Sequence, residues 1–199
     1  MTDWYRRTNW NEEIAADFEA RLARARPSNR AQYLSLQGYA LLSSRPEKSE
    51  ELLERAVSLA EGSELPRACC YLAIARTAQG KIDAAIDAYN IAIDAERREP
   101  LHRSTAGIDQ AFLIALFDRG ILYGHALEQL TLSIADQWSL AGLEALAADA
   151  IIRSRNGQAD IARERAREAL ALFPEESLGA QWAGISFDDL RLRLQAIAG

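Results

Sequence analysis

The chain has 199 residues, of which 49% are hydrophobic and 26% are charged, and its formal net charge is −6 at pH 7. An acidic balance of this kind argues against nucleic acid and anionic membranes as partners, because both are negatively charged. The chain has no apolar run near the ~20 residues of a membrane span, and its first residues lack a signal-peptide pattern, so we expect a cytoplasmic protein.

Almost the whole chain shows helical periodicity. Segments rich in alanine, leucine, arginine and glutamate carry apolar residues three and four positions apart, and none alternates in the manner of a strand. Glycine and proline number only 11 and 5 and fall mostly between these segments. They cut the chain into pieces of about 12 to 20 residues, which is typical of globular helices. We therefore predict an all-α fold.

The first predicted helix follows Asn9, which is a plausible N-cap, and runs to about Arg26. Its apolar stripe has a spacing of four residues and consists of Ile14, Phe18 and Leu22. That stripe needs a cover, and three aromatic residues lie just upstream: Trp4, Tyr5 and Trp10. We predict that residues 1–29 cap the N-terminal end of the fold.

Two later segments, 71–93 and 146–174, share one pattern of a helix, a glycine-containing turn and a second helix. In both segments, alanine recurs at the same offsets after the turn glycine. The matching positions are Ala85 and Ala92 after Gly80, and Ala162 and Ala169 after Gly157. Small residues at such positions allow two helices to approach closely, so they are expected where helices cross.

These offsets resemble the tetratricopeptide repeat family, in which a small residue, a large apolar residue, an alanine and a closing proline follow in order. The first copy matches with Ala85, Tyr89, Ala92 and Pro100. The last copy matches with Ala162, Ala169 and Pro174, and has Ala166 in place of the large residue. The opening of the chain is also similar to bacterial tetratricopeptide proteins of unassigned role.

The resemblance implies one domain over residues 1–199, built as a right-handed superhelical array of antiparallel helix pairs, an α-solenoid. Two weaker copies complete the array, giving four repeats: 30–65, 66–104, 105–142 and 143–176. The final stretch, 177–199, is predicted to be a C-terminal cap. Ser186 with Asp189 three residues later indicates the start of its helix, and Leu190 and Leu194 would dock on the last repeat.

Residues suited to catalysis or metal binding are sparse. His102 and His125 belong to no metal-spaced cluster, and no nucleophile, phosphate-loop or dinucleotide motif is present. Cys69 and Cys70 would point about 100° apart on a helix, which does not suit a disulfide, and two thiols cannot form a zinc site. We therefore expect no catalytic residues, no metal and no cofactor.

In the tetratricopeptide architecture, the first helices of successive repeats line a concave groove. The side chains expected there are mostly small and apolar, with arginines at the rim: Leu34, Gly38, Leu41, Arg67, Cys70, Ile74, Thr77, Ala111, Ala115, Asp118, Ala147, Ile151 and Arg155. Such a lining suits an amphipathic helix or an extended peptide with acidic groups. A groove filled by a terminal cap or a second subunit is equally consistent with it.

Arg76 and Arg153 occupy equivalent places in the two strongest repeats, where the family has an apolar residue. They could reach into the groove or pair with nearby acids such as Asp83 and Asp149. Pairing is the favoured interpretation.

Four functions remain open from the sequence. The first is a protein–protein interaction scaffold that binds another protein or a peptide of unknown identity. The second is a dedicated immunity or chaperone-like protein that neutralises or escorts a basic effector. The third is a self-assembling module, which would be a homo-oligomer. An enzyme with an unrecognised site is the least supported.

Overall fold

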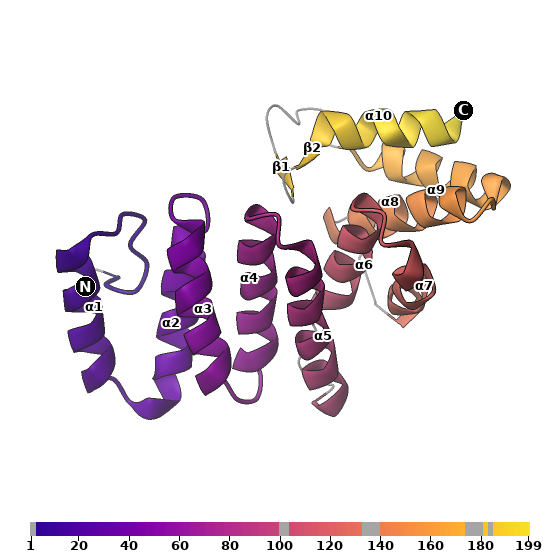
Figure 1. The fold of residues 1–199 in the computed structure, drawn as a ribbon. Helices are drawn as coiled ribbons and strands as arrows, with labels where there is room; N and C mark the ends of the chain where they lie inside the picture. The colour runs from indigo at the N-terminus through magenta and orange to yellow at the C-terminus, as the bar shows by residue number, and fades with distance from the viewer. Residues whose placement is uncertain (1–2, 100–103, 133–139, 174–180, 183–184) are drawn as a thin grey trace. The chain divides into compact units, whose positions relative to one another are not determined.

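A computed structural model describes residues 3–99, 104–132, 140–173, 181–182 and 185–199. In these residues the chain forms ten α-helices, one short 3-10 helix and one pair of two-residue strands (Figure 1). The all-α class is confirmed. Pro100, His102 and Pro174, which the sequence analysis singled out, lie outside the described residues. The chain divides into two compact units, residues 1–104 and 105–199.

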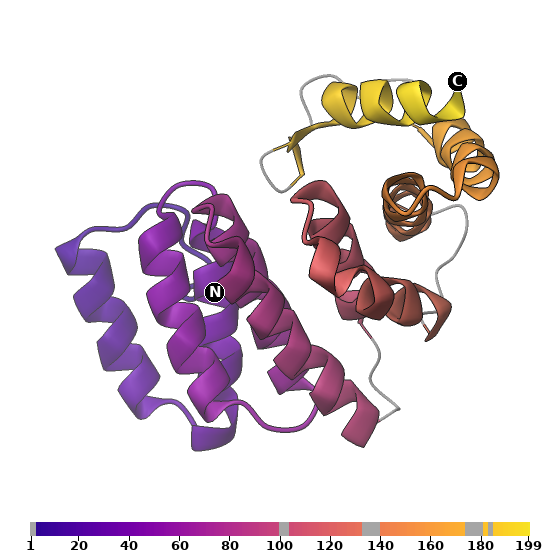
Figure 2. The ribbon, with the colours of Figure 1, turned by 45° about the vertical axis from the view of Figure 1, so that its right-hand side comes forward.

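The first unit contains five helices, which lie side by side in Figures 1 and 2. They are α1 (Glu12–Arg24), α2 (Pro27–Leu41), α3 (Pro46–Leu59), α4 (Glu64–Ala78) and α5 (Ile82–Arg98). Helix α2 packs on α3 and α4 packs on α5, and α3 and α2 both contact α4. The helices of this unit therefore pack as adjacent pairs.

Local sequence signals set the helix boundaries. Asn11, not Asn9, caps α1, and its side-chain oxygen accepts a hydrogen bond from the Ile14 amide at 2.8 Å. Prolines are the first residues of α2 and α3. An N–H at that position would have no acceptor within the helix, so proline, which lacks one, is tolerated there. Gly80 and Gly157 end helices with positive φ angles of 71° and 75°. Only glycine adopts that conformation without steric cost, which explains the turn glycine in both matched segments.

The N-terminal segment covers α1 as predicted. The ring of Phe18, which is buried, lies 5.4 Å from Trp4 and 5.6 Å from Trp10, centroid to centroid. Trp4 also lies 5.0 Å from Tyr33 on α2. Buried Gln37 fixes the segment further, because its side chain accepts a hydrogen bond from the Arg7 amide and donates one to the Arg7 carbonyl. The N-terminal segment thus shares one hydrophobic core with α1 and α2.

The repeated small residues lie where the helices cross. The alanines concerned are all buried, namely Ala85, Ala92, Ala162, Ala166 and Ala169, and so is the large residue Tyr89. The close approach of α4 to α5, and of α8 to α9, therefore accounts for the alanine spacing.

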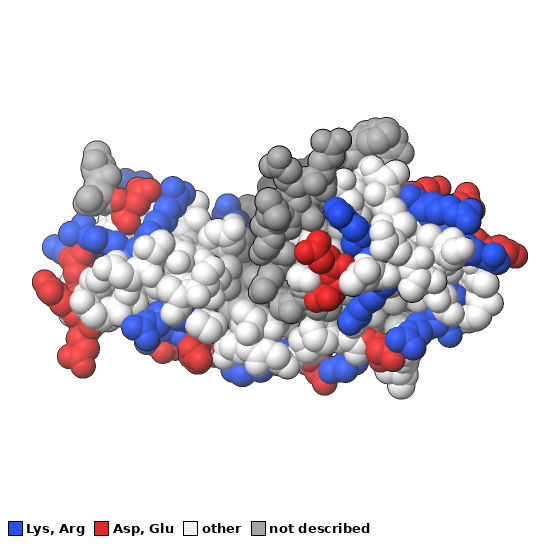
Figure 3. Space-filling view, turned by 90° about the horizontal axis from the view of Figure 1, so that it is seen from above, with Lys and Arg blue, Asp and Glu red and all other residues white. Residues whose placement is uncertain are grey.

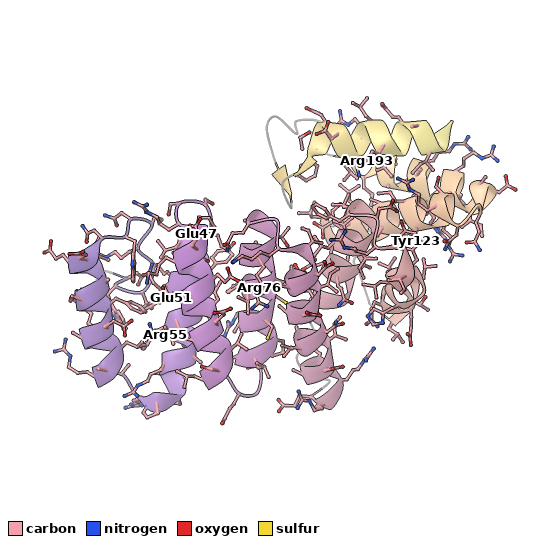
Figure 4. All side chains as sticks on the ribbon, viewed as in Figure 1. Glu47, Glu51, Arg55, Arg76, Tyr123 and Arg193 are labelled. Carbon is pink, nitrogen blue, oxygen red and sulfur yellow. The ribbon has the colours of Figure 1, made fainter. Side chains whose placement is uncertain are left out.

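Charged side chains tie neighbouring helices together. Arg76 on α4 binds Glu50 at 3.2 Å and Glu54 at 3.0 Å, both on α3, and donates to the Ala84 carbonyl. Arg55 forms a two-point ion pair with Glu19 on α1. Figure 4 shows Glu47, Glu51 and Arg55 following one another along α3, beside Arg76. The favoured structural pairing of Arg76 is thus observed, with acids of α3 as partners.

The second unit contains the remaining elements. They are α6 (Ala106–Leu116), the 3-10 helix η1 (Gly120–Leu122), α7 (Tyr123–Leu132), α8 (Leu140–Arg155), α9 (Ala159–Ala171), β1 (Gln181–Trp182), β2 (Ile185–Ser186) and α10 (Phe187–Ala198). Helix α6 packs on α7 and α8, and α8 packs on α9. The predicted pair of Arg153 and Asp149 is confirmed, with a distance of 2.9 Å from Nε to Oδ1.

The predicted C-terminal helix is confirmed as α10. The Ser186 hydroxyl accepts a hydrogen bond from the Asp189 amide at 3.1 Å, and Leu190 and Leu194 are buried against α8 and α9. Arg193, labelled in Figure 4, donates to the Leu116 carbonyl at the end of α6. Helix α10 thereby closes the second unit.

Candidate functional site: an aromatic face on α2 and α4

Two neighbouring helices of the first unit keep a stripe of side chains outside the core. On α2 the stripe comprises Gln32, Leu36 and Tyr39, and on α4 it comprises Arg67, Tyr71, Ile74 and Ala78. Spacings of three and four residues put each stripe on one side of its helix. Because α2 and α4 are in contact, the two stripes form one surface, the α2–α4 face.

A pair of tyrosines with tilted rings joins the two helices at the centre of this face. The ring centroids of Tyr39 and Tyr71 lie 4.4 Å apart, with the ring planes 37° from parallel. Tyr39 remains 50% exposed, and Ile74, one turn beyond Tyr71, remains 38% exposed. The face therefore presents an aromatic and an aliphatic side chain to solvent.

An ion pair borders the aromatic centre. Arg67 lies one turn before Tyr71 and pairs with Glu64 at the start of α4. The other carboxylate oxygen of Glu64 is buried and has no hydrogen-bond partner within the described residues. Burial raises the pKa of Tyr71, with Arg67 acting in the opposite direction. The hydroxyl of Tyr71 is therefore neutral at physiological pH and can donate or accept a hydrogen bond.

The structure separates the predicted groove residues of the first unit into two sets. Arg67 and Ile74 lie on the α2–α4 face. Leu34, Gly38 and Leu41 lie in the core, so the predicted register on α2 was wrong. The surface of that helix is formed by Leu36 and Tyr39 instead.

On α4, Cys70 and Thr77 are likewise buried. The Cys70 sulfur lies 3.6 Å from the Ser104 hydroxyl, and Thr77 donates to the Ala73 carbonyl within its own helix. Neither side chain lines an open surface, in contrast to the prediction.

Neither tyrosine was predicted from the sequence to lie on a binding surface. The sequence does place each tyrosine in a helical stripe, because Tyr39 lies three residues after Leu36 and Tyr71 lies three residues before Ile74. What the spacing could not supply was the side of the helix that faces the core.

The six groove residues predicted in the second unit are either buried or joined in an ion pair. Four of them are buried: Ala111, Ala115, Ala147 and Ile151. The other two, Asp118 and Arg155, are brought together, with 3.8 Å between Oδ1 and Nε. Asp118 also accepts a hydrogen bond from Tyr123, and burial together with this bond raises the pKa of Tyr123 to about 12.

Asp118 carries a positive φ of 55°, which costs free energy in a residue other than glycine. Its two partners lie on α7 and α8, so the three side chains join the end of α6 to both helices. This cluster accounts for the position of Asp118 and Arg155 without a ligand.

Charge is mixed over the face seen in Figure 3, where basic and acidic side chains occur in small groups with uncharged areas between them. In the described residues, no three His, Cys, Asp or Glu side chains are grouped so that they could hold a metal ion. Among those same residues, no helix is both long and apolar enough to cross a bilayer.

Comparison of the chain with protein-family models, curated proteins and solved structures finds no match.

Proposed function

We propose that the chain is a protein–protein interaction scaffold, without enzymatic activity, that binds a helix or peptide of a partner protein on the α2–α4 face. We further propose that its helix pairs form a right-handed tetratricopeptide-type solenoid and that it acts in the cytoplasm. The observation that supports binding is the contact between the rings of exposed Tyr39 and half-buried Tyr71. Tyrosine is enriched among the residues that dominate binding energy at protein interfaces.

The architecture of the face favours an amphipathic helix as the bound element. Both walls are α-helices, whose internal N–H and C=O groups are already bonded within the helix. A bound strand would find no main-chain partners there, whereas a helix satisfies its own. Its apolar side chains would pack on Tyr39, Tyr71 and Ile74, and an acidic residue at one end would meet Arg67.

Comparative affinity capture from cells of the source organism tests this proposal. The wild type is compared with a Tyr39→Ser/Tyr71→Ser variant, and captured proteins are quantified by mass spectrometry. The control variant is Leu59→Ser/Ile91→Ser, which removes two exposed apolar side chains from α3 and α5. Circular dichroism checks that both variants are folded.

The proposal predicts a protein retained by the wild type and the control, and lost from the tyrosine variant. Loss of each tyrosine should weaken binding about tenfold, as for interface residues that contribute about 1–2 kcal/mol. Equal retention by all three proteins would show that the face does not bind that partner.

A further inference from the structure

A groove in the second unit lies between α7, α8 and α9. It has a volume of about 220 Å³ and is lined by Leu127, Leu130, Thr131, Ala145, Leu146, Asp149, Arg153 and Arg165. One part of this lining is aliphatic and the other part is charged. The α7–α9 groove is therefore amphipathic.

Two arginines share one aspartate at the charged part. Asp149 accepts from Arg153 Nε through Oδ1 at 2.9 Å and pairs with Arg165 Nε through Oδ2 at 3.2 Å. Arg153 also donates from Nη1 to Gln158 at 2.8 Å, and Arg165 from Nη1 to Glu168 at 2.7 Å. Within the described residues, the Nη2 groups of both arginines make no hydrogen bond. The aspartate thus orients two guanidinium groups that retain unused donors.

The aliphatic part consists of Leu127 and Leu130 on α7 and Ala145 and Leu146 on α8. The Thr131 hydroxyl beside them already donates to the Leu127 carbonyl at 2.9 Å. All three walls are helical, so their internal main-chain groups are bonded to one another. A hydrocarbon chain needs no hydrogen-bond partner and fits this lining, whereas the backbone of an extended peptide would stay unsatisfied.

We propose that the α7–α9 groove binds an aliphatic monocarboxylate of the fatty-acid type. The carboxylate accepts hydrogen bonds from Arg153 and Arg165, whose planar guanidinium groups match its two oxygens. The hydrocarbon chain lies along Leu127, Leu130 and Leu146. The site is independent of the α2–α4 face and does not rest on the function proposed for that face.

Acidic residues beside the arginines, Asp149 among them, oppose this binding, and Glu168 provides a specific test. Glu168 is not part of the lining, but it occupies Nη1 of Arg165 and contributes a negative charge close to the groove. Glu164 adds a further negative charge near Arg165. Replacing Glu168 by glutamine should release Arg165 and strengthen binding a few-fold, an effect that loss of packing would not produce.

Titration of the full-length protein with octanoate, followed by calorimetry and by NMR amide shifts, tests the proposal. Octanol supplies the same chain without charge, and acetate supplies the charge without the chain. We expect saturable octanoate binding, with shifts at Leu127 and Leu146 but not at Tyr39. Octanol and acetate should each bind at least about tenfold more weakly.

The variants complete the test. Arg153→Gln/Arg165→Gln should weaken octanoate binding at least about tenfold. Arg163→Gln, which removes an exposed arginine on α9 outside the lining, should leave it unchanged. If the double variant does not fold, the proposal is tested by the comparison of octanoate, octanol and acetate and by the affinity of Glu168→Gln for octanoate. Absence of saturable octanoate binding, equal binding of octanol, or weaker binding by Glu168→Gln would overturn the proposal.

Discussion

Gly38 is a residue whose lack of a side chain sets the distance between two helices. A Cβ atom at this position would lie 2.6 Å from Cγ of Leu53, well inside van der Waals contact. The Gly38 carbonyl also accepts a hydrogen bond from the buried Ser49 hydroxyl at 2.7 Å. Helices α2 and α3 can therefore reach this separation only because residue 38 is glycine.

Gly38→Ala should lower the free energy of unfolding by about 1–3 kcal/mol, because the added methyl group overpacks the α2–α3 contact. Urea denaturation followed by circular dichroism measures the change. Gly124→Ala on α7 is the control, since a Cβ atom there meets nothing within 4 Å. The control should be neutral or stabilise by about 0.5–1 kcal/mol. Equal stability of Gly38→Ala and the wild type would show that the contact can relax.

Glu144 makes stability depend on pH. Burial, and then the charge and hydrogen bond of Asp109, raise the pKa of this carboxyl from 4.5 to about 8. The folded protein therefore keeps a proton that the unfolded chain has released. The unfolding free energy consequently falls as pH rises from 4.5 to about 8, and the contribution of Glu144 is constant outside that window.

Glu144→Gln removes this titration and should be relatively more stable towards alkaline pH. The difference in unfolding free energy, wild type minus variant, should fall by on the order of a few kcal/mol across the window. Urea denaturation at a series of pH values measures it. The exposed Glu128→Gln is the control and should keep the wild-type slope. A Glu144→Gln variant with that same slope would refute the assignment.

At the scale of the helices, the sequence was informative about periodicity and less so about orientation. The helical class, the aromatic cover of Phe18 and the helix beginning after Ser186 were all predictable, because each depends on neighbours within a few residues. The exposed side of α2 was not. Its weakly amphipathic sequence places Leu34 and Leu36 on different sides, and only contacts with α1, α3 and α4 decide which of them is buried.

The ion pairs of Arg76 with Glu50 and Glu54, which join α4 to α3, can be tested at this scale. Arg76 is largely buried and pairs with two acids of α3, so its removal leaves Glu50 without one of its partners. Arg76→Ala should lower the unfolding free energy by about 1–3 kcal/mol. Arg97→Ala, which breaks an exposed pair with Asp94 within α5, should change it by less than about 0.5 kcal/mol. Equal effects of the two variants in urea denaturation would contradict a structural role for Arg76.

At the scale of the whole molecule, the chain has two compact units, residues 1–104 and 105–199. Such a division is not visible in a repeat pattern, because the spacing of alanines describes each helix pair and not the boundary between pairs. The hydrophobic core around Phe18, Leu34 and Leu52 lies wholly within residues 1–104. The first unit thus has the core that independent folding requires.

A fragment of residues 1–104 should therefore fold by itself. We expect a sigmoidal urea transition that gives the same midpoint by circular dichroism and by the fluorescence of Trp4 and Trp10, as for a two-state domain. A shorter fragment, 1–78, lacks α5, which buries one side of α4, and should lose this cooperativity. A gradual transition for 1–104 would show that its folding needs the second unit.

The central claim is that the α2–α4 face binds a partner protein, and site-specific photo-crosslinking tests it most directly. The photoreactive amino acid p-benzoylphenylalanine replaces Tyr39 in one version of the chain and Ile91 on α5 in the other, and both are irradiated in cells. We predict a discrete adduct with one partner from position 39 that is absent from position 91 and lost when Tyr71→Ser is added. The same adducts from both positions, or none from position 39, would contradict the claim.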